Sequence, residues 1–124
     1  MIQANELRIG NWLSLNEDGT LFQVTEITNG GLSISNKDED TWIEYDQFGR
    51  ILLTPEILEK CGFDPSLTKT CYGRLSSDGK DRFSIFSDGR FKFHSEDLSV
   101  KIIYLHQLQN LYYALTGEEL NYKP

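Results

Sequence analysis

The sequence has no long apolar segment. It nowhere contains the ~18 consecutive apolar residues that a membrane-spanning helix needs, and its first residues, MIQANELRIG, carry no hydrophobic signal-peptide core. We therefore expect a cytoplasmic protein with no membrane span. The absence of a Pro-, Gly- or Ser-rich stretch likewise predicts no flexible linker between its parts.

Basic residues are also scarce. The 12 Lys and Arg residues stand against 19 Asp and Glu, which gives a net charge of −7. Nucleic acid and anionic lipid both require a positive surface. The charge balance therefore disfavours a nucleic-acid partner for the chain as a whole, while it leaves a local basic patch open.

Metal-ligand spacing is missing. The chain has two cysteines, Cys61 and Cys71, and two histidines, His94 and His106, and in the sequence these four residues stand ten or more positions apart. A structural zinc site usually shows at least one close ligand pair. We expect no metal, no cofactor and two reduced thiols, since one bridge would not make a disulfide scaffold.

The usual catalytic motifs are absent as well. No nucleophile elbow, dinucleotide fingerprint, Walker loop or H-E-x-x-H occurs. We expect a non-enzymatic protein, with Cys61 as an inert thiol at a helix end and His106 as a helix-surface or interface residue. An enzyme would need His106 or His94 beside an acid and Cys61 or Cys71.

One further absence concerns the segment 104–120. No Asp, Glu, Lys or Arg occurs from Leu105 to Thr116. A helical period places six apolar side chains on one face: Tyr104, Leu105, Leu108, Leu111, Tyr112 and Leu115. Four neutral polar or aromatic side chains form the other face: His106, Gln109, Asn110 and Tyr113. A solvated face normally carries charge, so we expect this face to be covered, either by the chain itself or by another molecule.

What the sequence does contain is typical of a folded α+β protein. Seven Phe, six Tyr and two Trp make it too aromatic for a disordered chain. Apolar segments separated by Asn- and Gly-rich turns predict strands at 7–15, 21–27, 32–35 and 41–48. We expect these to form a small bent antiparallel sheet or an SH3-like barrel, with the acidic run at 38–40 as a solvated turn.

The middle of the chain predicts a short connecting helix at 55–61. Thr54 suits the N-cap, Pro55 suits the first helical turn, and Gly62 suits the left-handed closing position. Phe63 is expected to contact Leu58 across that closure.

The second half predicts an irregular strand at 67–75, a hairpin and a further strand at 98–103. Asp88-Gly89 is typical of a two-residue hairpin loop. That loop would place Phe86, Phe91 and Phe93 on the face covered by the last helix, and Phe83 and Ile85 on the other face with Lys92 and His94. The whole chain then forms a single domain, 1–124, made of a β-rich half (1–50), the connecting helix (51–66) and the second sheet with its helix (67–124).

Three segments resemble a known family. ANELRIGNWL at 4–13, LTPEILEKCGF at 53–63 and YLHQLQNLYYALTGEEL at 104–120 are similar to small uncharacterised proteins encoded by phages and prophages of Bacteroides-type gut bacteria, in which the LHQLQNLY-aromatic-ALTG ending is the hallmark. The resemblance implies a phage or prophage origin and a bacterial host cytoplasm. It implies no catalytic or binding residues.

The sequence supports two hypotheses for function. The first is a phage accessory or host-interaction protein that binds a protein partner, or a second copy of itself, through His106, Gln109, Asn110 and Tyr113. The second is a small-ligand or nucleotide-sequestering protein with a pocket near Trp42, Tyr72 and Arg74.

Overall fold

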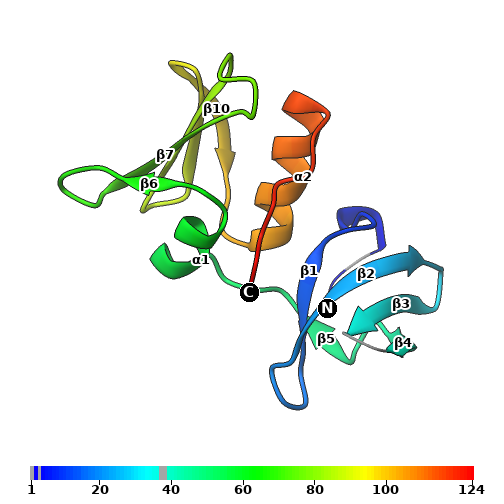
Figure 1. Cartoon of the computed structure of the whole chain (residues 1–124). Helices are drawn as coiled ribbons and strands as arrows, with labels where there is room; N and C mark the ends of the chain where they lie inside the picture. Colours follow the sequence, from blue (N-terminus) through cyan, green and yellow to red (C-terminus); the bar gives the residue numbers. More distant parts are fainter. Residues whose placement is uncertain (1, 3, 37–38) are drawn as a thin grey trace. The chain divides into compact units, whose positions relative to one another are not determined.

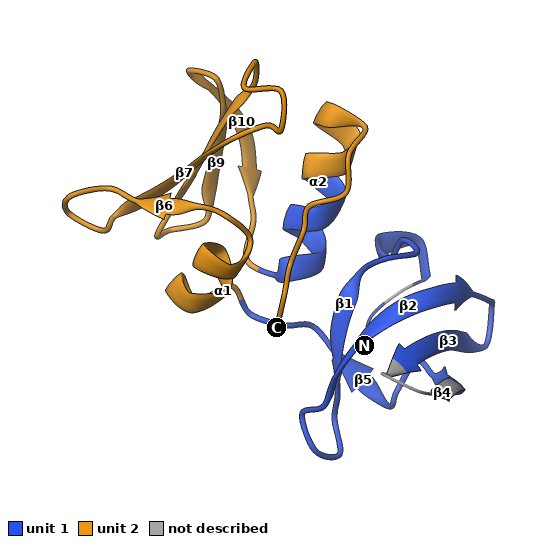
Figure 2. Ribbon diagram, in the orientation of Figure 1, with its two compact units in different colours: residues 1–52, 104–111 blue, residues 53–103, 112–124 orange. Residues whose placement is uncertain are grey.

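The computed structural model describes residues 2, 4–36 and 39–124. It contains two five-stranded antiparallel sheets and few helices, which confirms the predicted α+β class (Figure 1). The chain divides into two compact units, residues 1–52 with 104–111 and residues 53–103 with 112–124 (Figure 2). The predicted acidic turn at 38–40 falls at Asp38, which lies outside the described residues, and at two neighbours whose side chains are not described.

Unit 1 is built on a bent sheet that follows a short 3-10 helix. Its elements are η1 (Ala4–Glu6), β1 (Trp12–Leu15), β2 (Leu21–Ile27), β3 (Gly31–Asn36), β4 (Glu39–Glu44) and β5 (Phe48–Gly49), with the strands in the order β4-β3-β2-β1-β5. The segment predicted as one strand at 41–48 is interrupted, because Gln47 turns the chain by donating its N–H to Glu44 O. The SH3-like barrel stays a prediction, since no strand pairing joins β4 to β5 among the described residues.

The core of unit 1 follows from strand alternation. Along β2 the side chains of Phe22 and Val24 are buried while those of Gln23 and Thr25 are exposed. Phe22 meets Phe48 edge-on, with ring centroids 5.9 Å apart. Burial of such aromatic and aliphatic side chains supplies the main stabilising free energy of the sheet.

The short helix α1 (Pro55–Lys60) forms as its sequence predicts. Thr54 Oγ1 accepts the N–H of Ile57 at 3.2 Å, and Gly62 takes a left-handed φ of +86°. The N–H of Phe63 donates to Leu58 O at 3.0 Å, which closes the helix.

Unit 2 contains the second sheet, a five-stranded antiparallel meander. Its strands are β6 (Asp64–Pro65), β7 (Cys71–Leu75), β8 (Arg82–Phe86), β9 (Arg90–Phe93) and β10 (Glu96–Lys101), in the order β10-β9-β8-β7-β6. The strand predicted at 67–75 therefore begins later, after a turn. The predicted reversal at 76–79 is confirmed, with Gly79 at a φ of +73°.

The register predicted for the β8–β9 hairpin is wrong by one residue. Ile85 faces Phe91 and Phe83 faces Phe93, so the loop has three residues, 87–89, rather than two. Gly89 donates its N–H to Phe86 O at 2.9 Å and adopts a φ of +92°. A turn followed by a left-handed glycine closes a three-residue loop, and the Asp-Gly pair suits that loop as well as the shorter one.

This one-residue difference exchanges the two faces of β8 relative to β9. Phe83, Ile85 and Phe91 are buried on the inner face. Phe86 lies on the other face, where the guanidinium of Arg90 stands 4.7 Å from its ring centroid. The inner face therefore carries Phe83 and Ile85 in place of Phe86, and the outer face carries Phe86 with Lys92.

The last helix, α2 (Leu105–Thr116), agrees with the predicted helix. It ends where Gly117, at a φ of +74°, donates its N–H to Tyr113 O. In unit 2 the Tyr112 ring packs on Phe83 with centroids 5.0 Å apart, as expected for a helix that covers an aromatic sheet face. No helix in the described part of the chain is long and apolar enough to cross a membrane.

The two adjacent glycines of unit 1 provide a matched test of its packing. A Cβ at Gly31 would lie 2.1 Å from Ile43 O, whereas a Cβ at Gly30 would lie at an ordinary 3.6 Å from the Trp42 ring. We expect Gly31→Ala to lower the free energy of unfolding by about 2 kcal/mol or more, because a backbone atom must move. Gly30→Ala is the control and should cost less than about 1 kcal/mol in urea denaturation; equal losses would contradict the close approach of β3 and β4.

Candidate functional site

The side chains predicted to bind a partner are mostly internal. His106 and Gln109 are each only 1% exposed, Asn110 is half-buried, and Tyr113 is 42% exposed. Both alternatives for covering this helix face had been left open by the sequence. The structure shows that the chain itself covers His106 and Gln109.

Gln109 uses both ends of its amide. Its Nε2 donates to Gly10 O at 3.1 Å, and its Oε1 accepts the N–H of Trp12 at 2.8 Å. These bonds join α2 to the start of β1 within unit 1. A buried backbone N–H and carbonyl are thereby satisfied without burying a charge.

Asn110 completes the same contact. Its Nδ2 donates to Glu6 O at 3.0 Å, and its Oδ1 accepts from Asn11 Nδ2 at 2.8 Å. Asn11 is itself fully buried, and its Oδ1 accepts the N–H of Arg8 at 2.7 Å. The predicted partner-binding strip is therefore corrected: three of its residues hold α2 on residues 6–12, and Tyr113 alone of the four is exposed.

His106 lies beside a small charged cluster. Its Nε2 stands 3.7 Å from Glu6 Oε1, and the same carboxylate oxygen accepts from the Arg50 guanidinium, with the nearer nitrogen at 2.9 Å. Arg50 also lies over the Tyr104 ring, which stacks on the imidazole. Burial lowers the pKa of His106, and although Glu6 raises it, Arg50 lowers it further. The ring is enclosed, and a catalytic base must be accessible to its substrate, so this position does not suit that role.

The two cysteines differ in their surroundings. Burial raises the pKa of Cys61 to about 12, against a smaller lowering by Arg74, so the thiol stays protonated. Cys71 is a half-buried free thiol on β7. Within residues 2, 4–36 and 39–124, no group of three or more His, Cys, Asp or Glu side chains is arranged to hold a metal ion.

The residues of the predicted ligand pocket have structural contacts. Trp42 belongs to unit 1, is 51% exposed and lies against Gly31, while Tyr72 is buried opposite Ile85 in unit 2. Arg74 donates from Nη1 to Cys61 O at 2.6 Å, and its guanidinium lies 5.3 Å from the Tyr112 ring centroid. Tyr72 is therefore part of the interior of unit 2, whereas Arg74 is half-buried and also borders a hollow.

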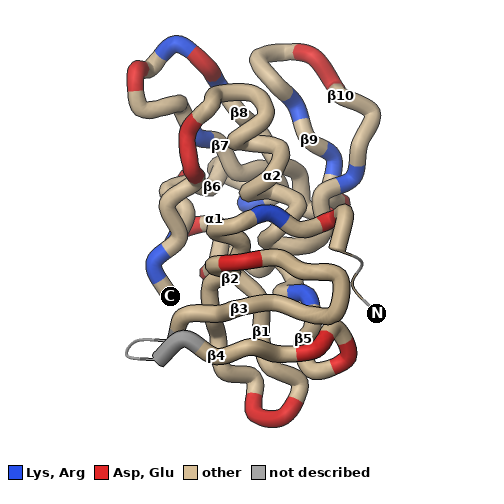
Figure 3. Tube along the Cα trace, turned by 90° about the vertical axis from the view of Figure 1, so that its right-hand side faces the viewer, with Lys and Arg blue, Asp and Glu red and all other residues tan. Residues whose placement is uncertain are grey.

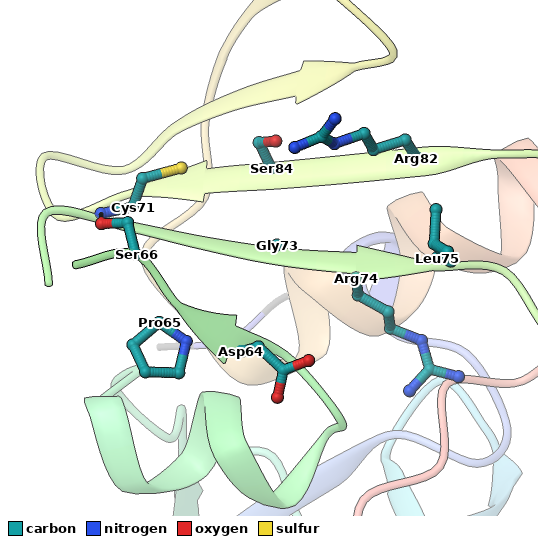
Figure 4. Close-up of a pocket in the computed structure, with 9 residues that line it drawn as sticks. All are labelled: Asp64, Pro65, Ser66, Cys71, Gly73, Arg74, Leu75, Arg82 and Ser84. Atoms are coloured by element: carbon teal, nitrogen blue, oxygen red, sulfur yellow. Dashed lines mark hydrogen bonds between the residues drawn. The ribbon is translucent and has the colours of Figure 1, made fainter.

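One hollow in unit 2 lies across β6, β7 and β8 (Figure 4). It has a volume of about 440 Å³, and nine residues line it: Asp64, Pro65, Ser66, Cys71, Gly73, Arg74, Leu75, Arg82 and Ser84. A second hollow of about 350 Å³ shares Arg82 and Ser84 and extends over β9 to Lys92 and His94. We name the combined surface formed by Gly73, Leu75, Arg82, Ser84, Phe86 and Lys92 the outer groove.

Strand register explains the shape of the outer groove. Gly73 pairs with Ser84, so two small residues form a low floor across β7 and β8, and Lys92, the partner of Ser84 on β9, borders it. Leu75 pairs with Arg82 on one side of this floor, and Cys71 pairs with Phe86 on the other. Because alternate residues of a strand share a face, both pairs stand as walls beside the floor.

The outer groove is locally cationic in an acidic protein. Lys and Arg gather along β9, in contrast to the acidic turns elsewhere (Figure 3). Arg82 is exposed, and neither it nor Lys92 forms an ion pair with a described residue. Two neighbouring side chains have carboxylate partners: Arg90 pairs with Asp88 at 2.9 Å, and His94 Nε2 lies 3.2 Å from Asp81 Oδ1.

Sequence reasoning missed this surface because of the hairpin register. The predicted two-residue loop placed Lys92 on a face with Phe83 and Ile85, where no hydrophilic groove forms. Shifting the register by one residue places Lys92, Ser84 and Phe86 together. The signal in the sequence was the alternation of Arg82, Ser84 and Phe86 with buried Phe83 and Ile85.

The hydrogen bonds of Gln109 can be tested against an exposed glutamine that shares the same acceptor. Gln109→Leu leaves the Trp12 N–H without its side-chain acceptor, and we expect it to lower the free energy of unfolding by about 1–3 kcal/mol. Gln23→Leu removes an exposed bond to the same Gly10 O and should cost less than about 0.5 kcal/mol. Urea denaturation measures both, and similar losses would argue against the internal role of Gln109.

The enclosure of His106 predicts a pH dependence of stability. Because its folded pKa lies below the ordinary 6.5, the unfolded chain binds more protons as the pH falls through that value, and the folded state loses relative stability. Between about pH 7.5 and about pH 5.5, wild type should lose more unfolding free energy than His106→Gln, which cannot titrate. The variant also loses the ring contact with Tyr104, which lowers its unfolding free energy at every pH. The comparison therefore uses the slope of unfolding free energy against pH rather than its absolute value. Parallel slopes would contradict the prediction.

Comparison of the chain with protein-family models, curated proteins and solved structures found no match. The resemblance to phage-encoded proteins stays a prediction. The candidate site therefore depends on the geometry of the outer groove and on the chemistry of its side chains.

Proposed function

We propose that this chain is a non-enzymatic accessory or host-interaction protein that acts by protein-protein contact through the outer groove. The resemblance of its three segments to phage and prophage proteins supports that biological setting. The proposal keeps the predicted class of function but moves the contact surface from α2 to the second sheet.

The observation that carries the proposal is the composition of the outer groove. Its floor is small, at Gly73 and Ser84, and one wall includes Leu75, whose side chain is 56% exposed. Cations, a hydroxyl and apolar side chains thus lie together on an open sheet face. Contact surfaces combine apolar area with Arg and aromatic side chains in this way.

The enclosure of two side chains considered for catalysis, Cys61 and His106, supports a non-enzymatic role. The Cys61 thiol is buried and protonated, and His106 is enclosed against Glu6. A nucleophile needs an adjacent base and access to substrate. Neither described group combines the two.

The alternative function, binding of a small ligand or nucleotide, has one observation in its favour. The volume of about 440 Å³ lies in the range of small-molecule sites. However, the hollow is open along the sheet, and the Arg74 guanidinium points away from Ser84 on the other side of β7 (Figure 4). A mononucleotide that raised the melting temperature would favour this alternative over protein contact.

Site-specific photo-crosslinking tests the proposed contact surface. A photo-reactive phenylalanine analogue replaces Leu75 on the groove wall, and the same analogue at Thr25, an exposed residue of β2, serves as control. In host cells that carry the phage or prophage, we expect a discrete protein adduct from position 75 and none from position 25.

Filling the groove floor provides the matched variant. A Cβ at Gly73 would lie 3.7 Å from Phe83 O, an ordinary contact at a position without a left-handed φ. Gly73→Phe should therefore fold, and it should reduce the adduct from position 75 by about tenfold or more. An adduct that Gly73→Phe leaves unchanged, or one that forms equally from position 25, would overturn the proposal.

A further inference from the structure

Resting on the proposed protein contact, we infer that the outer groove binds an acidic, extended segment of its partner, with partner carboxylates on Arg82 and Lys92. This names the chemistry of the partner, which the proposed function leaves open. Four observations carry it: the charges, the arrangement of hydrogen-bond donors, the apolar wall and the cations that cover the half-buried Phe86 ring.

The first observation is charge. Arg82 and Lys92 have no ion-pair partner among the described residues, although the chain carries a net charge of −7. Arg82 borders both hollows and Lys92 borders the second. Asp97 is the cross-strand partner of Lys92, and Asp64 lines the first hollow, yet neither carboxylate forms an ion pair with these two cations. Both cations can therefore accept an anionic group of a partner.

The second observation is the arrangement of hydrogen-bond donors. The side chain of Arg82 extends over the sheet toward Ser84 (Figure 4), and Lys92 is the cross-strand partner of Ser84. A guanidinium, a hydroxyl and an ammonium therefore border one part of the floor. The planar guanidinium matches a carboxylate bidentately, and charge-assisted bonds of this kind are the strong ones.

The third observation is the apolar wall. Leu75 is the cross-strand partner of Arg82, and its side chain is 56% exposed beside the floor. An extended peptide presents alternate side chains to opposite faces at a spacing of about 7 Å. A segment that alternates acidic residues with small or aliphatic ones can thus place carboxylates on the cations and an apolar side chain on Leu75.

The fourth observation separates a peptide from single-stranded nucleic acid. Nucleic-acid surfaces offer free aromatic faces on which bases stack. The Phe86 ring is already covered, with Arg90 at 4.7 Å and Lys92 at 5.3 Å from its centroid.

Fluorescence anisotropy with defined probes tests the inference. The first probe is a short labelled peptide in which Glu alternates with Ser around one central Leu, and the second replaces each Glu by Gln. We expect wild type to bind the Glu peptide about tenfold or more tightly than the Gln peptide, and its affinity should fall as salt is raised. A labelled oligothymidylate is the third probe and should bind more weakly than the Glu peptide.

Charge-matched variants localise the binding. Arg82→Gln with Lys92→Gln should weaken the Glu peptide by about tenfold or more. Lys60→Gln with Lys123→Gln removes the same charge from two other exposed positions and should change the affinity less than about twofold. If both double variants lose the same affinity for the Glu peptide, binding depends only on the net charge of the protein, and the inference is overturned.

The remaining outcomes are also decisive. Tighter binding of oligothymidylate would identify a nucleic-acid surface, and self-association of wild type that Arg82→Gln abolishes would identify a second copy as the occupant; either result overturns the acidic-peptide inference. If Gly73→Phe reduces the crosslinked adduct but Arg82→Gln with Lys92→Gln does not, the proposed protein contact is supported and the acidic nature of the partner is contradicted. If Gly73→Phe and the double variant each abolish the adduct, and wild type binds the Glu peptide, the protein contact and the acidic partner are both supported.

Discussion

The hydrogen bonds between α2 and the segment 6–12 are the constraint on which unit 1 depends. A helix face that carries Gln109 and Asn110 is polar enough to be mistaken for a surface, yet each amide has a defined partner in the chain. Neutral amides can be buried with two or more satisfied bonds, whereas a carboxylate or ammonium there would lose much more solvation free energy. This accounts for the neutral side chains at Gln109 and Asn110 in a helix without charged residues from Leu105 to Thr116.

A second constraint operates in unit 2, at the hairpin between β8 and β9. Gly89 closes the loop in a left-handed conformation, and the resulting register buries Phe83, Ile85 and Phe91. The same register leaves Phe86 and Lys92 outside. The turn therefore settles which face becomes core and which becomes the outer groove, because side chains alternate strictly along each strand.

Because of these two constraints, the surface open to a partner lies on the second sheet and not on the face of α2 that carries Gln109. The helix face that lacks charge supports the protein internally, and the sheet face that gathers cations offers the open surface. We propose protein contact there, and an acidic extended segment as the occupant. The free thiol of Cys61 and the enclosed ring of His106 belong to the structural interior of their units.

Local signals determined much of the fold from the sequence alone. Thr54, Pro55 and Gly62 define α1 because capping and left-handed closure depend on residues a few positions apart. The period of α2 and the strand alternation of β2 follow from equally local preferences.

Tertiary structure decided what those local signals leave open. Gln109 could have faced a partner or residues 10–12, and Asp88-Gly89 suits a two-residue or a three-residue loop equally well. The first choice depends on whether distant backbone groups reach the amide, and the second on whether the phenylalanines of both strands can be buried together. Both are free energies of long-range packing, which no short stretch of sequence contains.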